Sequence, residues 1–274
     1  MKVYDSNMLR NIAVLGHSGC GKTNLIEAIA YTSNLTKKIP NLTDKTNMTY
    51  SMNLIPVEYD NYKFNLLDTP GYFDFVGEVI SSLRASDAAV IVIDAITPIQ
   101  VGTEKSLELT ENIPKIMFIN KIDNEKARYK DAIAMLRDKY GSKVVPMIIP
   151  IYKDKKFVKL HNIFENMDDL DGEFKTEAST VKEALMELIA ETDDIMLDKY
   201  FSGEELTSAE IQKGITIGMQ NGDIIPVICG STINNIGTKE ILETVSSYLD
   251  PKYKDSDSEF KGLVFKTKVD PFKG

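Results

Sequence analysis

Eight residues near the start of the chain have the spacing of a loop that binds phosphate groups. They are Gly16, His17, Ser18, Gly19, Cys20, Gly21, Lys22 and Thr23. A short apolar run over 11–15 precedes them and a helical pattern begins at Lys22, so the expected context is a strand, a glycine-rich turn and a helix N-terminus. Backbone N–H groups in such a turn point at phosphate oxygens, and the helix dipole adds partial positive charge. Lys22 is therefore expected to contact the β- and γ-phosphates of a nucleotide, and Thr23 to bind Mg²⁺.

A second polar motif follows the apolar run over 64–67, where Asp68 precedes Gly71 by three residues. Open α/β sheets bind ligands beyond the carboxyl ends of their strands, which is where Asp68 would lie. We expect Asp68 to hold Mg²⁺ through water and the backbone N–H of Gly71 to reach the γ-phosphate. Asp and Gly are common in turns, so this motif carries weight through its position after the phosphate loop and a second strand.

A third motif, Asn120-Lys121-Ile122-Asp123, follows the apolar run over 116–119. The Asp123 carboxylate can accept hydrogen bonds from N1–H and the 2-amino group of guanine, which adenine cannot match. Each such bond to a charged group is worth about 1.5–3 kcal/mol. Asn120 is expected to brace the loop and the Lys121 stem to cover the base. The alternative is a solvated polar turn, but the order of the three motifs predicts a site for GTP or GDP.

The bulk composition is that of a globular protein without a membrane segment. Length, 274 residues, is enough for about two domains, and 43% of residues are hydrophobic and 27% charged. There is no apolar run of membrane-spanning length and no apolar core of a signal peptide at the start, so we expect a cytoplasmic location and no membrane partner. Cys20 and Cys229 fit a reducing compartment. The net charge of −9 argues against direct nucleic-acid binding, and a monomer is expected.

From residue 11 to residue 121 strands and helices alternate, as in a mostly parallel sheet covered on both faces. Asp60-Asn61 has the composition of a hairpin turn and predicts one antiparallel edge strand. Apolar spacing predicts a helix over 125–140 that Gly141 ends.

After Pro150 the alternation loosens, and we interpret 151–222 as an insertion before a final strand at 225–228. Two helix starts are predicted inside it from capping boxes, Thr180 with Glu183 and Thr207 with Glu210. An apolar stripe that runs from Val181 to Ile195 is expected on the first of these helices.

The segment over 68–78 resembles the switch region of bacterial elongation factor G and its paralogues. The segments over 101–105, 119–123, 190–194 and 226–231 are also similar to that family. The resemblance implies an α/β P-loop GTPase domain with a mostly parallel sheet over 1–150 and 223–258, an inserted α+β subdomain over 151–222, and the start of a following β-barrel domain over 259–274. We therefore expect a fragment of a longer protein. The resemblance also implies that backbone groups of Gly230, Ser231 and Thr232 contact the base, that Thr49 is the Mg²⁺-binding switch residue, and that the ribosome is a partner.

Departures from the family pattern bear on catalysis. Tyr72 occupies the position of a His that positions the attacking water, and Gly19 that of an Asp implicated in cation-assisted catalysis. Together they resemble a divergent group, the elongation factor G-like proteins. The segment over 35–47 is shorter than the family's first switch, and Thr232 stands where Ala is usual.

The resulting prediction is an enzyme, a Mg²⁺-dependent GTPase of translation-factor type whose intrinsic hydrolysis is weak. Lys22, Gly71 and Tyr72 are the candidate catalytic residues, and Thr23, Thr49 and Asp68 the candidate metal ligands. One alternative is a GTP-binding regulatory switch with negligible hydrolysis. A P-loop ATPase or kinase is a further alternative, which Asn120 to Asp123 oppose.

Overall fold

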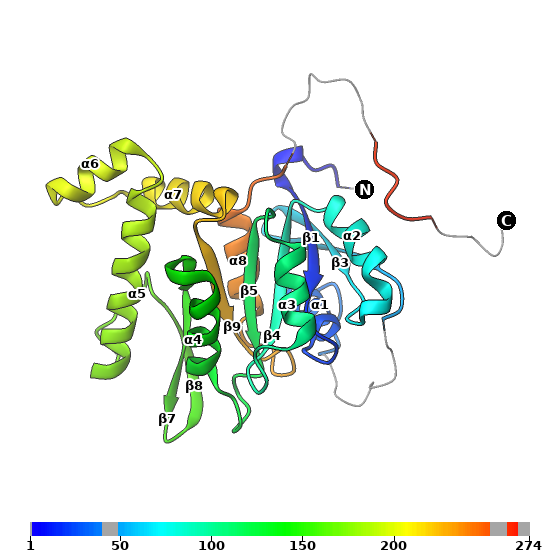
Figure 1. Ribbon diagram of the computed structural model, residues 1–274, viewed down its shortest axis with the longest axis horizontal. Coiled ribbons are helices and arrows are strands. Elements are labelled where there is room, and N and C mark those ends of the chain that lie inside the picture. Colours follow the sequence, from blue (N-terminus) through cyan, green and yellow to red (C-terminus); the bar gives the residue numbers. More distant parts are fainter. Residues whose placement is uncertain (1, 40–48, 253–261, 268–274) are drawn as a thin grey trace.

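The computed structural model describes residues 2–39, 49–252 and 262–267. A seven-stranded sheet forms its centre (Figure 1). In spatial order its strands are β2 (Asn53–Tyr59), β3 (Tyr62–Asp68), β1 (Leu9–Leu15), β4 (Ala88–Asp94), β5 (Lys115–Asn120), β9 (Ile225–Cys229) and β6 (Val144–Pro146). All neighbouring strands run parallel except β2, which pairs antiparallel with β3. The predicted α/β fold class is confirmed.

Helices cover both faces of this sheet (Figure 1). The α-helices of the described residues are α1 (Lys22–Thr32), α2 (Val76–Arg84), α3 (Val101–Leu109), α4 (Tyr129–Tyr140), α5 (Gly172–Ala190), α6 (Asp194–Ser202), α7 (Ser208–Asn221) and α8 (Thr238–Tyr248). Three-residue 3₁₀ helices occupy Ser6–Met8, Phe73–Phe75 and Gly141–Lys143. No helix among the described residues is long and apolar enough to cross a membrane.

Strand β1 packs against helices on both faces of the sheet. Its alternate residues Ile12 and Val14 belong to the large apolar cluster that includes Leu25 of α1 and Ile241 of α8. Ala13 and Leu15 point to the other face and pack with Val79 and Leu83 of α2. Because successive side chains of a strand point to opposite faces, a short apolar run here is buried on both sides.

Two predicted chain reversals are confirmed. Asp60 and Asn61, with φ of 44° and 67°, join β2 to β3 in the left-handed conformation that tight hairpins require. Gly141, with φ of 71°, ends α4 at the predicted residue, although that helix begins at Tyr129 rather than at 125.

The region over 151–222 lies at the β6 end of the sheet, where α5 and α6 extend outward (Figure 1). Strands β7 (Ile148–Lys153) and β8 (Lys156–Asn162) form a separate hairpin that crosses the predicted boundary at 151. Residues of α5 and α7 share an apolar cluster with the main sheet. The division into a GTP-binding domain and an insertion therefore stays a prediction, as does the β-barrel start over 259–274, of which only 262–267 are described.

One of the two predicted helix starts is wrong. Thr207 and Glu210 form the expected capping box at the start of α7. Thr180 instead lies inside α5, which begins at Gly172, because Phe174 and Ala178 extend the buried stripe of Val181 and Leu185 by two turns. The stripe also stops early: Ile195 lies on the separate helix α6 and is 69% exposed.

Candidate nucleotide-binding site

The predicted phosphate loop joins β1 to α1 at the carboxyl edge of the sheet. Gly21 has φ of 104°, and a Cβ atom there would lie 2.3 Å from Nδ2 of Asn120, so only glycine fits. No side chain caps the first turn of α1. The N–H groups of that turn are therefore available to an anion.

Lys22 is 7% exposed, and its Nζ donates to the carbonyl oxygens of Gly16 and His17, both at 3.0 Å. An ammonium group has three donors, so these two bonds leave one for a phosphate oxygen. Gly71 lies directly against this amine, because a Cβ atom on Gly71 would be 2.4 Å from Nζ and 2.9 Å from the backbone N of Ser18. The first and second motifs thus meet, as their positions on the adjacent strands β1 and β3 require.

The three candidate metal ligands converge on one point. The Thr23 hydroxyl donates to Oδ2 of Asp68 at 2.9 Å, and the Thr49 hydroxyl donates to the same oxygen at 3.3 Å. The two hydroxyl oxygens are 3.3 Å apart. Thr49 precedes the antiparallel strand β2, which brings it back beside Asp68 at the end of β3.

The Asp68 carboxylate is buried and has an oxygen that is free to bind a cation. It is 3% exposed, and its Oδ1 atom has no hydrogen-bond partner among the described residues. Burial raises the pKa of Asp68, while hydrogen bonds from Thr23 and Thr49 and the charge of Lys22 oppose the rise. One carboxylate and two hydroxyl oxygens are hard donors that suit Mg²⁺, so the residues present fit this ion.

Asn120 links three loops from the interior. It is 1% exposed, and its Nδ2 donates to the carbonyl oxygen of Cys20 at 2.9 Å. Its Oδ1 accepts from the backbone N–H of Lys121 at 2.8 Å and from that of Thr232 at 3.0 Å. These bonds place the Gly230–Thr232 loop beside the phosphate loop, in the arrangement that a bracing role requires.

Lys121 is held in place by Asp94, a residue that the sequence analysis missed. Its Nζ lies 2.5 Å from Oδ2 of Asp94 and donates to the carbonyl oxygen of Gly19 at 3.0 Å. The backbone of Lys121 has φ of 67°, a left-handed conformation. The position of Asp94 at the carboxyl end of β4, in register with Asn120, was the available signal.

The end of the third motif faces solvent. Asp123 is exposed, and its Oδ2 accepts from Nδ2 of Asn234 at 2.6 Å. Asn234, also missed, follows the loop of Ser231 and Thr232, whose side chains are each 1% exposed. The backbone N–H of Ile122 donates to the carbonyl oxygen of Gly230 at 3.2 Å, which joins the two loops.

A further contact that the sequence did not reveal ties the phosphate loop to α3. Nδ1 of His17 accepts from the backbone N–H of Gly102 at 3.2 Å. A Cβ atom on Gly102 would lie 2.7 Å from that nitrogen, so the close approach depends on glycine.

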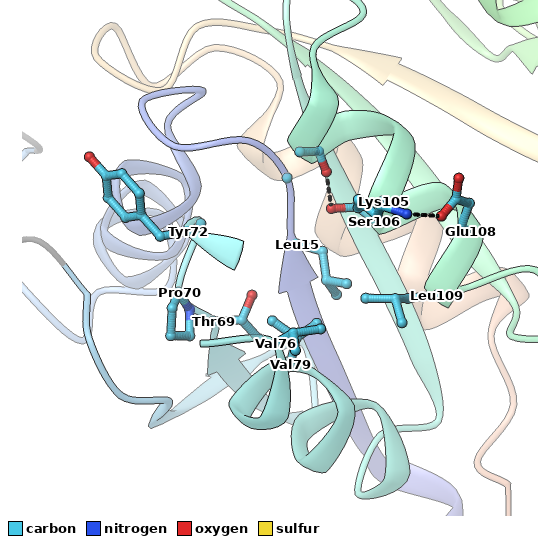
Figure 2. Close-up of a pocket in the computed structure, with 13 residues that line it drawn as sticks. Leu15, Thr69, Pro70, Tyr72, Val76, Val79, Lys105, Ser106, Glu108 and Leu109 are labelled. Atoms are coloured by element: carbon cyan, nitrogen blue, oxygen red, sulfur yellow. Dashed lines mark hydrogen bonds and ion pairs between the residues drawn. The ribbon is translucent and has the colours of Figure 1, made fainter. Parts of the chain in front are cut away.

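A pocket of about 370 Å³ opens between the switch segment, α2 and α3 (Figure 2). Leu15, Val79 and Leu109 form its apolar floor, and Tyr72 lies at its rim with the ring directed away from Lys105 and Ser106. Tyr72 is 41% exposed. Gly19 is the other residue that departs from the family pattern. A Cβ atom built on it would have no atom of the described residues within 4 Å, apart from those of Gly19 itself and its chain neighbours.

Residues 7–251 match the family described as Elongation factor Tu GTP binding domain. The chain belongs to this family. Members of the Elongation factor Tu GTP binding domain family bind and hydrolyse guanine nucleotides, so the chain is a translation-factor-type GTP-binding domain.

A solved structure from Thermus thermophilus, of the protein ttk003000868, is similar to this chain. The two superpose with a TM-score of 0.81 at 29% identity, over 89% of this chain and 40% of the other. Together the family match and this structure confirm the resemblance to the GTP-binding domain of an elongation factor G-like protein. The chain spans about two fifths of the Thermus protein's length.

Proposed function

We propose that this domain binds GTP together with Mg²⁺ and hydrolyses the γ-phosphate slowly, as part of a translation factor that acts on the ribosome in the cytoplasm. The observation that carries the proposal is the convergence of Thr23, Thr49 and Asp68 beside Lys22. These residues come from three separate parts of the sequence, 22–23, 49 and 68, and the unpartnered Oδ1 of Asp68 supports a cation there.

The reaction is attack of water on the γ-phosphorus, which breaks its bond to the bridging oxygen of GDP and releases phosphate. Lys22 would neutralise phosphate charge, and the N–H of Gly71 would donate to a γ-phosphate oxygen. Mg²⁺ would stabilise the charge that develops on the phosphate oxygens. Thr23, Thr49 and Asp68 would hold that ion.

We expect slow hydrolysis because of Tyr72 and Gly19, the two positions where the chain departs from the family pattern. A phenol can orient water through its oxygen but is a poor base at neutral pH. Gly19 supplies no carboxylate to recruit a second cation. Most of the rate would then come from charge stabilisation, and we expect turnover slower than about 10⁻² s⁻¹ in the isolated domain.

The second candidate, a GTP-binding switch with negligible hydrolysis, rests on the exposure of Tyr72. The ribosome as partner rests on family membership. The net charge of −9 instead opposes direct RNA contact by this domain.

The test combines binding of a fluorescent (mant) GTP with single-turnover hydrolysis, with and without ribosomes. Lys22→Ala should abolish most binding, because the triphosphate loses its main buried counter-charge. Thr23→Ala should instead lower the effect of Mg²⁺, with Thr176→Ala, an exposed helical threonine on α5, as the matched control. Wild-type binding by both site variants would overturn the proposal, and hydrolysis undetectable with ribosomes would select the switch.

A further inference from the structure

The segment 262–267 contacts the chain just after Thr49, a candidate metal ligand, and also helix α2, which follows the candidate catalytic residues Gly71 and Tyr72. Nζ of Lys266 donates to Oγ of Ser51 and to the carbonyl oxygen of Met52, and lies 3.4 Å from Oε2 of Glu78 on α2. The Lys266 side chain is only 15% exposed. In Figure 1 this segment, drawn in red, runs past α2 on the side of the molecule remote from α6.

Glu78 binds the same two residues, Ser51 and Met52. Its Oε2 accepts from the backbone N–H of Met52 at 2.7 Å and from Oγ of Ser51 at 3.4 Å. Glu78 and Lys266 therefore bind the N–H and the carbonyl of the same residue. Met52, which is 1% exposed, is fixed at both polar backbone groups.

This fixed point lies close to a candidate metal ligand. Thr49 is three residues before Met52, a separation of at most about 11 Å along the chain. A second contact joins the same segments, since the ring of Tyr50 meets that of Phe75 edge-on at 5.8 Å. A displacement of Met52 would consequently also move the Thr49 hydroxyl, whose oxygen is 3.3 Å from Oδ2 of Asp68.

We propose that Glu78 and Lys266 form a clasp on Met52 that positions Thr49, so that the metal-dependent part of GTP binding depends on the segment 262–267. The inference rests on the proposed function, because it names what regulates that metal site. Neither residue touches the nucleotide region, and both act through the backbone of 51–52.

The ionic state of the clasp suits this role. The hydrogen bond from Met52, and with it the charge of Lys266, lowers the pKa of Glu78. The carboxylate is thus charged at neutral pH. A partly exposed ion pair near the surface contributes little by itself, so any effect on the metal site must come through the two bonds to Met52.

The test measures how Mg²⁺ slows release of mant-GTP from the 274-residue chain. In Glu78→Ala and in Lys266→Met we expect the Mg²⁺ concentration at half effect to rise about tenfold, which is the lower end of the loss for a residue that supports a metal ligand. Release of mant-GDP in EDTA should stay unchanged. Lys266→Arg should restore most of the wild-type response.

A matched control is available on α8. Lys239 and Glu243 form an exposed pair with the same 3.4 Å separation, so Lys239→Met and Glu243→Ala remove equal charges away from the site. A metal-free measurement complements the titration: amide exchange of a peptide that covers Met52 should be faster in Glu78→Ala than in wild type.

Two results would overturn the clasp. If wild type responds to Mg²⁺ and the clasp variants match the α8 controls, the clasp fails while the proposed function stands. If wild type itself shows no response to Mg²⁺, the metal part of the proposed function fails, and the clasp with it.

Discussion

Asn120 donates to the carbonyl oxygen of Cys20 at 2.9 Å across 100 residues of sequence. This bond joins the loop that is predicted to recognise the base to the loop that is predicted to hold the phosphates. Because Asn120 also accepts from the N–H of Thr232, the three loops form one unit.

Asn120→Ala should destabilise the domain by about 2 kcal/mol or more. The substitution leaves the buried carbonyl of Cys20 and the N–H of Thr232 without their partner, and each unsatisfied buried group costs about 1–3 kcal/mol. Nucleotide affinity should fall in parallel. Urea unfolding without nucleotide and mant-GDP titration would measure the two effects. Asn124→Ala, an exposed asparagine of the same loop, is the control, and equal behaviour of the two variants would contradict the bracing role.

Asp123→Asn should shift the preference from guanine to xanthine nucleotides, because the amide NH₂ group is a donor where the carboxylate offers only acceptors. Isothermal titration with GTP, XTP and ATP would measure it, with Asp138→Asn on α4 as the control. Retained guanine preference would mean that the base is recognised elsewhere. ATP affinity within about tenfold of GTP in the wild type would contradict the guanine assignment. A carboxylate placed to accept from the N–H groups of guanine should strongly reject adenine, which lacks them.

Tyr72→Phe should change the basal hydrolysis rate less than about threefold, because a positioned proton-transfer group would contribute about 10²–10⁴-fold and this hydroxyl is not expected to act as one. Single-turnover hydrolysis is the measurement. Tyr200→Phe removes the hydroxyl of a similarly exposed tyrosine on α6 and serves as the control. A hundredfold loss would instead make Tyr72 a working catalytic residue.

The contact between α6 and α7 should depend on pH. Lys199, at 2.5 Å, and the N–H of Thr207 lower the pKa of Glu210 from 4.5 to about 2. A lowered carboxyl pKa stabilises the fold fully above pH 4.5, and that contribution is lost as the pH falls toward 2. Glu210→Gln should therefore flatten the rise of unfolding free energy with pH between about 3 and 5, measured by urea unfolding. Glu205→Gln is the control, and an unchanged slope would contradict the shifted pKa.

Local patterns in the sequence are enough to predict a mostly parallel sheet, the order of the three motifs and the candidate site residues. Short apolar runs that end in Gly16, Asp68 and Asn120 predict parallel strands, and local spacing carries the turn at Asp60 and the capping box at Thr207. These features depend on neighbours within a few residues, so the sequence suffices.

Which distant groups meet depends on how the folded segments pack. Nothing near Asn234 or Glu78 along the chain marks their partners Asp123 and Met52, because those contacts arise when segments far apart in the sequence pack side by side. The same reason accounts for Thr180: its local pattern is that of a helix start, yet burial of Phe174 and Ala178 against the core carries α5 through it. Local propensity predicts elements, whereas long-range packing selects their ends and partners.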